Sequence, residues 1–240
     1  MTRLPFSLRL LCLIIGIILL PASFSVTVAV FRIAFNCPDL IPNVMTFFIG
    51  FVSHLIFFLA FRKPMLAYVV GHELTHALWV LMFRGRIRSI SVSKNGGAVK
   101  ASKVNPLILL APYFFPIYTL AVIGLWLLLS YLYPIQKFLP LAVFFIGFTW
   151  SFHLLLNLHT LTESQPDILA VGRVFSAVLI YTLNVFILGL LITFVSQSLS
   201  YRTFFNQLAA GFLLPYWRVM DWLAIGFEKL RLMLAQYFSW

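Results

Sequence analysis

Two histidines and a glutamate lie within five residues of one another in the apolar stretch VVGHELTHAL, residues 69–78. His72 and His76 are four residues apart, so on an α-helix both imidazoles project from the same face. Two imidazoles in this arrangement can bind one zinc ion, and Glu73 beside them can take a proton from a water on that ion. The pattern predicts a zinc site with His72 and His76 as metal ligands and Glu73 as the catalytic general base.

The position of Glu73 inside an apolar segment favours a bound cation. The whole chain has only six acidic residues, and one of them stands here beside two histidines. An ionisable side chain deep in a bilayer costs roughly 2.5–3.5 kcal/mol on insertion scales. A divalent cation offsets that cost, because it takes the neutral imidazole nitrogen and favours the ionised carboxylate. The alternative is a buried polar cluster that ties helices together, with Glu73 protonated and hydrogen-bonded.

A second group of polar residues lies in FHLLLNLHTLTESQPDI, residues 152–168. A catalytic zinc ion usually has three protein ligands and an open fourth position for water. We expect Asp167 to be the third ligand, because it follows Pro166 at the start of a predicted helix and can point into the bundle. The same position also suits an acid that caps the helix. Asn157 is expected to hydrogen-bond the substrate or a transition-state oxyanion. The alternative third ligands are Glu163, His153 and His159.

The composition places these motifs in a membrane protein. Hydrophobic residues make up 62% of the 240 residues and charged residues only 10%, which leaves too little polar surface for a soluble domain. A helix needs about 20 apolar residues to cross a bilayer. The first apolar run continues to Phe31, which favours a retained helix over a cleaved signal peptide. We predict an all-α polytopic protein in the lipid bilayer with six transmembrane helices, at about 8–31, 42–61, 65–83, 106–132, 139–160 and 174–198.

The net charge of +11 does not indicate nucleic-acid binding. The basic residues are scattered, and the densest group, RGRIR at 84–88, directly follows a predicted span. Basic residues that flank membrane spans are the ordinary explanation, and no nucleic-acid partner is expected. Divided between the two sides of six spans, Lys and Arg number nine and eight, so charge does not fix the orientation of the chain.

Two segments outside the spans have characteristic patterns. Residues 86–103 alternate in polarity and contain Asn95-Gly96-Gly97, a sequence that favours tight hairpin turns. We predict a small β-hairpin there, after the third span. Residues 201–240 form a tail that follows the membrane domain at 1–200. From Phe212 to Trp240, charged residues share one arc of a helical wheel and apolar residues the opposite arc, which predicts an amphipathic helix in the membrane interface.

These features together resemble the site-two protease family of intramembrane zinc metalloproteases. The matching pieces are GHELTHA on a span, the SKNGGAV hairpin and a late pair of spans with an aspartate, and they cover about residues 65–180. The resemblance implies a helical bundle that holds zinc below the membrane surface. It also implies that the hairpin faces the cytosol and binds the substrate by strand addition, which gives substrate-binding roles to Ser93, Gly96 and Gly97.

The chain would be a divergent member of that family. The second family motif, N-x-x-P-x-P-x-L-D-G, has aspartate eight residues after asparagine, whereas Asp167 is ten residues after Asn157. The expected function is that of a zinc-dependent endopeptidase of a bacterial plasma membrane. Its substrate would be a membrane protein, cut in a transmembrane or membrane-proximal segment. The alternatives are a non-hydrolytic membrane scaffold and a metal-binding or transport protein.

Overall fold

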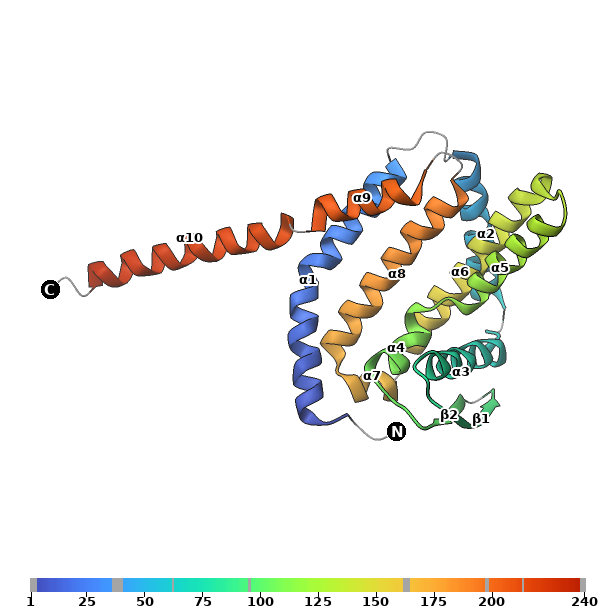
Figure 1. The fold of residues 1–240 in the computed structure, drawn as a ribbon, viewed down its shortest axis with the longest axis horizontal. Coiled ribbons are helices and arrows are strands. Elements are labelled where there is room, and N and C mark those ends of the chain that lie inside the picture. Colours follow the sequence, from blue (N-terminus) through green and yellow to red (C-terminus); the bar gives the residue numbers. More distant parts are fainter. Residues whose placement is uncertain are drawn as a thin grey trace.

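Helices form most of the chain in the computed structural model, which describes residues 4–35, 41–61, 63–94, 96–161, 165–196, 199–212 and 214–237 (Figure 1). The longer helices of the bundle are α1 (Phe6–Phe35), α2 (Ile41–Ala60), α3 (Met65–Met82), α5 (Ile117–Leu132), α6 (Leu139–Leu161) and α8 (Arg173–Val195). Shorter elements are α4 (Pro106–Phe114), the 3-10 turn η2 (Gln136–Phe138) and α7 (Pro166–Val171). The strands β1 (Ile87–Ser93) and β2 (Gly96–Ala101) stand between α3 and α4, and α9 (Tyr201–Phe212) and α10 (Leu214–Tyr237) form the tail.

The helices have the lengths and compositions of a multi-pass membrane protein. Among the described residues, five helices are long and apolar enough to cross a membrane, and the bent pair α4–α5 raises the number to six if it counts as one span. Large apolar side chains such as Ile18, Ile56 and Leu128 remain exposed along them. The predicted class, predominantly helical with one small antiparallel hairpin, is confirmed.

The span expected at 106–132 is two helices, α4 and α5, bent by 70° relative to each other. The bend falls at Phe115 and Pro116, because proline has no N–H and disfavours the α conformation in the residue before it. Phe115 is extended, with φ −98° and ψ 101°. In a continuous helix the carbonyl of Pro112 would accept from residue 116, which here has no hydrogen to donate.

Two asparagines from other helices bind the carbonyl groups that the bend frees. Asn157 in α6 donates to the carbonyl oxygens of Pro112 at 3.4 Å and of Tyr113 at 3.3 Å. Asn184 in α8 donates to the Tyr113 carbonyl at 2.9 Å. Because an unpaired backbone group in lipid costs several kcal/mol, these contacts stabilise the bend.

Helix α3 runs across the other long helices rather than alongside them, at the lower end of the bundle in Figure 1. Lys63, just before α3, contacts the ring of His159 near the end of α6. The hairpin after α3 lies at the same end of the bundle (Figure 1). Both ends of α3 therefore lie at the same end of the bundle, which differs from the six aligned spans expected from the sequence. Apolar length shows that a helix can cross a membrane but does not give the direction in which it packs.

A Schellman motif ends α3 and turns the chain into the hairpin. The N–H of Gly85 donates to the carbonyl of Val80, and that of Arg84 to the carbonyl of Leu81, both at 2.8 Å. Arg84 has the left-handed φ of 57° that this motif requires. The chain thus reverses and β1 packs against α3.

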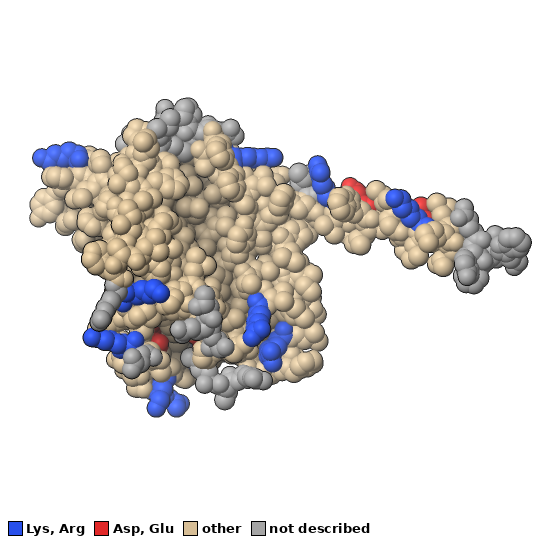
Figure 2. Space-filling model, turned by 180° about the vertical axis from the view of Figure 1, so that it is seen from behind, with Lys and Arg blue, Asp and Glu red and all other residues tan. Residues whose placement is uncertain are grey.

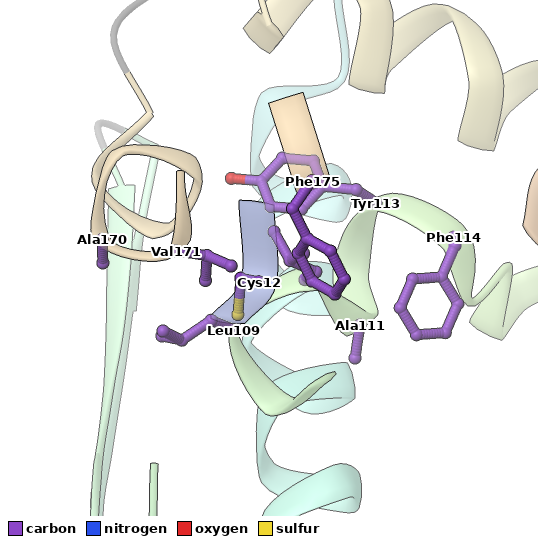
Figure 3. Close-up of a cluster of buried hydrophobic side chains, with 9 residues drawn as sticks. Cys12, Leu109, Ala111, Tyr113, Phe114, Ala170, Val171 and Phe175 are labelled. Atoms are coloured by element: carbon purple, nitrogen blue, oxygen red, sulfur yellow. The ribbon is translucent and has the colours of Figure 1, made fainter. Parts of the chain in front are cut away.

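An apolar cluster holds the two short helices α4 and α7 in place. It joins α4 and α7 to the lower parts of α1 and α8 (Figure 3). Because α4 carries Tyr113 and α7 carries Asp167, this packing positions both residues. The members are Cys12, Leu109, Leu110, Ala111, Tyr113, Phe114, Ala170, Val171 and Phe175.

The predicted hairpin is present, but its glycines are not in the turn. β1 and β2 pair antiparallel, with Ser93 opposite Gly96 and Val92 opposite Gly97. Gly96 has a φ of 139° and begins β2 rather than the connection. The predicted turn residue Asn95 lies outside the described residues.

In the tail, α10 corresponds to the helix expected from Phe212 to Trp240, and a further helix, α9, precedes it. α9 packs on α1 through Phe204, which is buried with Val26, Val30 and Ile33. α10 projects from the bundle (Figure 1), and its side chains are exposed from Trp217 to Leu234. Figure 2 shows the charged side chains of this projecting helix along one side, as the helical wheel predicts. Its placement in the membrane interface stays a prediction.

Candidate metal centre

The candidate centre forms where α3 meets α7. His72 and His76 belong to α3, and Asp167 stands in the first turn of α7. Asp167 Oδ2 lies 3.7 Å from Nε2 of His72 and 3.5 Å from Nε2 of His76. One donor atom from each of the three residues lies within 4.8 Å of the other two. The structure brings together the three residues that the sequence predicts as ligands.

The spacing of these atoms suits a zinc ion. Zinc binds histidine nitrogen and carboxylate oxygen at about 2.0–2.2 Å, so two donors of a tetrahedral site are about 3.4 Å apart. The carboxylate-to-imidazole distances of 3.5 and 3.7 Å need only a small contraction to reach that value. Asp167 Oδ1 is a buried acceptor without a hydrogen-bond partner in the described chain. Such an atom favours a cation nearby.

The backbone of α4 orients one of the two imidazoles. His76 Nδ1 lies 2.8 Å from the carbonyl oxygen of Ile108. Because a carbonyl can only accept, this contact places the proton on Nδ1 and leaves the lone pair of Nε2 free for a metal. The first turn of α4 is itself fixed by Asn105, whose side chain accepts from the N–H of Ile108 at 2.8 Å.

Asp167 is held in the ionised form that metal binding requires. Burial alone would raise its pKa. When the imidazoles of His72 and His76 are protonated, their hydrogen bonds and positive charge outweigh burial and lower the pKa of Asp167 to about 2, and a bound cation would act on the carboxylate in the same direction. The carboxylate is therefore negative at any physiological pH.

Glu73 is buried beside His72, and strand β2 packs directly on it. A Cβ built on Gly97 would overlap Glu73 Cγ and lie 2.8 Å from Glu73 Oε1, so the strand comes this close only with glycine. Ser93 and Gly96 lie at the exposed tip of the hairpin, where Ser93 Oγ donates to the Gly96 carbonyl at 2.8 Å. Of the predicted substrate-binding residues, Gly97 thus lies against the proposed general base.

Tyr113 is a neighbour of the centre that the sequence reasoning missed. Its hydroxyl lies 3.3 Å from Gln165 Oε1 and 3.5 Å from Asp167 Oδ2, and its one hydrogen can be donated to either oxygen or shared between them. Its ring meets the ring of His72 edge-on, with centroids 5.3 Å apart. The sequence does contain a signal for such a role, namely a tyrosine between two prolines in an apolar run. A tyrosine buried in such a run usually has a polar partner for its hydroxyl, so a polar neighbour could have been expected.

Asn157 is engaged by the protein itself. Its Oδ1 accepts from the hydroxyl of Tyr68 at 3.2 Å, and its amide nitrogen donates to the carbonyls of the α4–α5 bend. The expectation that it binds substrate stays a prediction. In this structure its amide joins α3, α4 and α6 beside the candidate centre.

The alternative third ligands have other partners. His153 Nε2 lies 3.2 Å from Asn184 Oδ1, and His159 Nε2 lies 3.2 Å from the ammonium of Lys63. Among the described residues, the group of candidate metal ligands contains neither histidine. Glu163 lies outside the residues that the structure describes.

A small cavity of about 20 Å³ adjoins His72 and has room for about one water molecule. It is lined by α3, α6 and the α4–α5 bend. Its polar lining includes Tyr68, Thr75 and His153. The imidazole of His72 beside it is largely buried, with its side chain 12% exposed.

No protein-family model, no curated protein and no solved structure matches the chain. Function is therefore inferred from the geometry of the centre.

Proposed function

We propose that the protein is a zinc-dependent intramembrane endopeptidase, as the resemblance of its motifs to site-two proteases implies. The supporting observation is the convergence of His72, His76 and Asp167, whose donor atoms lie within 4.8 Å of one another, with the carboxylate 3.7 and 3.5 Å from the two imidazoles. Glu73 follows the first of these histidines in the same helix. The substrate would be a membrane protein, and the setting a bacterial plasma membrane with the hairpin on the cytosolic side.

In this proposal the metal ligands and the general base are different side chains. His72, His76 and Asp167 would hold zinc, which would polarise the scissile carbonyl and activate water. Glu73 takes the proton from the attacking water and delivers it to the leaving amine. Burial of Glu73 under β2 limits the positions that its carboxylate can adopt.

The hairpin would present the peptide to these groups. A helical substrate hides its amides in internal hydrogen bonds, so it has to unwind before hydrolysis. In the described chain the sheet has only two strands, so each strand has an outer edge that is unpaired within the sheet. A peptide that adds to one edge is held extended next to Glu73.

The test compares the purified protein with the variant Glu73→Gln. Zinc content is measured by elemental analysis, and turnover on a panel of single-span test proteins by gel. We expect about one zinc per chain in both, and a turnover about 10²–10⁴-fold lower in the variant, as for loss of a general base. Glu228→Gln, in the projecting helix α10, is the matched control and should keep full turnover.

Three results would contradict the proposal. Absence of zinc from gently purified wild-type protein would favour a scaffold. Zinc without cleavage of any test protein would favour metal binding or transport. Undiminished turnover in Glu73→Gln would remove the proposed base.

A further inference from the structure

A second site lies at the opposite end of the bundle from the candidate metal centre. It is a furrow of about 300 Å³ between α1 and the α9–α10 segment. On α1 its lining residues recur once per helical turn, and the other wall comes from the end of α9 and the start of α10. The lining consists of Phe24, Ser25, Val28, Ala29, Arg32, Gln207, Gly211, Pro215 and Arg218.

The charge of the furrow is entirely positive. Arg32 in α1 and Arg218 in α10 line it, and no acidic residue does. Within the described ranges, neither guanidinium has an ion pair or hydrogen bond to another residue. An arginine pair of this kind suits a phosphate group, because a guanidinium can donate two parallel hydrogen bonds to it.

A buried polar group inside the furrow also lacks a partner. Gln207 Oε1 is buried and accepts no hydrogen bond from the described residues. Buried polar atoms are normally paired, and because Gln207 lines the furrow, rotation of its side chain toward the furrow would let a ligand supply the missing donor. A ligand that carries a hydroxyl group next to a phosphate would bind both: the hydroxyl would donate to Gln207 Oε1, and the phosphate would accept from the arginines.

The remaining lining is apolar. Phe24, Val28, Ala29 and Pro215 form a wall that suits an acyl chain. The furrow lies near the end of a long apolar helix and at the root of the exposed amphipathic helix α10, where lipid head groups would meet the protein.

We propose that this furrow binds the head group and upper acyl chain of one anionic phospholipid. The phosphate pairs with Arg32 and Arg218, a head-group hydroxyl donates to Gln207, and the chain lies along Phe24 and Val28. The site is independent of the proposed protease activity. It would tie α10 to the bundle at the membrane surface.

Native mass spectrometry of the detergent-purified protein tests this proposal, with phosphatidylglycerol and phosphatidylcholine as probes. We expect the wild-type protein to bind one phosphatidylglycerol at least roughly tenfold more tightly than phosphatidylcholine, as for charge-assisted hydrogen bonds. The double variant Arg32→Gln/Arg218→Gln should lose this preference. The matched control, Arg202→Gln/Lys229→Gln, removes two basic residues of the same tail helices outside the furrow and should keep it.

A further variant fills the furrow without changing its charge. Val28→Trp should weaken phosphatidylglycerol binding while the thermal unfolding temperature of the purified protein stays close to the wild-type value, which shows that the protein is folded. Equal loss of preference in the control pair would show diffuse charge attraction and overturn the site. Retention of the preference in the furrow pair, or displacement of the lipid by inorganic phosphate, would overturn it as well.

Discussion

At the scale of single residues, the metal centre depends on groups that are distant in sequence but share one oxygen atom. Asp167 Oδ2 faces His72, His76 and the hydroxyl of Tyr113 at 3.5–3.7 Å. The histidine pair could be predicted, because helical spacing alone puts both rings on one face. Asp167 could be proposed only as one of several acids and histidines. Tyr113 could not be assigned, because its partner depends on how α4 packs against α7.

The assignment of the third ligand leads to a prediction at this scale. Asp167→Asn keeps the size of the side chain but removes its negative charge, so zinc affinity should fall by more than the roughly 10–100-fold that loss of an outer hydrogen-bond partner costs. A competition titration with a zinc chelator measures this. Asp221→Asn in α10 is the control and should bind zinc as the wild type does. A larger loss in Glu163→Gln or His153→Gln than in Asp167→Asn would assign the ligand differently.

At the scale of elements, the sequence predicts where helices occur better than how they run. The bend between α4 and α5 has a local cause in Phe115-Pro116, which the sequence contains. The groups that stabilise it, Asn157 and Asn184, come from two later helices. The crosswise direction of α3 has no local cause at all, since it follows from packing against α4 and the hairpin. Hydrophobic periodicity contains no information of that kind.

The close contact between Gly97 of the hairpin and Glu73 of α3 predicts that adding one methyl group at Gly97 lowers activity. Gly97→Ala should push β2 away from Glu73 or displace the carboxylate, because the added Cβ has no room. We expect turnover to fall at least about tenfold, by misplacement of the base, while zinc content stays unchanged. Gly124→Ala in α5 is the matched control, since its Cβ would meet no atom within 4 Å. A drop in zinc content equal to the drop in turnover would instead mean that Gly97 maintains the fold of the centre.

At the scale of the whole molecule, the crosswise α3 changes how the basic residues divide between the two ends. Figure 2 shows most of them at the lower end, around the hairpin and the start of the bundle. By the ends of the elements in Figure 1, the described basic residues at the lower end are Arg9, Lys63, Arg84, Arg86, Arg88, Lys94, Lys100, Lys103 and Arg173. Arg32, Lys137 and Arg202 lie near the upper ends of the bundle helices, and α10 of the tail adds Arg218, Lys229 and Arg231. The even division expected for six aligned spans is replaced by nine described basic residues on the hairpin side against six on the other.

Because cytoplasmic loops carry the excess of Lys and Arg, the hairpin and the end of the bundle that holds the metal centre should face the cytosol, and the tail the opposite side. Single cysteines placed by Lys63→Cys, Lys94→Cys and Arg202→Cys, in a background with Cys12 and Cys37 changed to serine, test this with a membrane-impermeant maleimide. In intact cells only the cysteine at 202 should react, and lysis should expose the other two. If α3 crossed the membrane, positions 63 and 94 would lie on opposite sides and their labelling would differ. Equal protection of both is therefore specific to a helix that returns to the side from which it began.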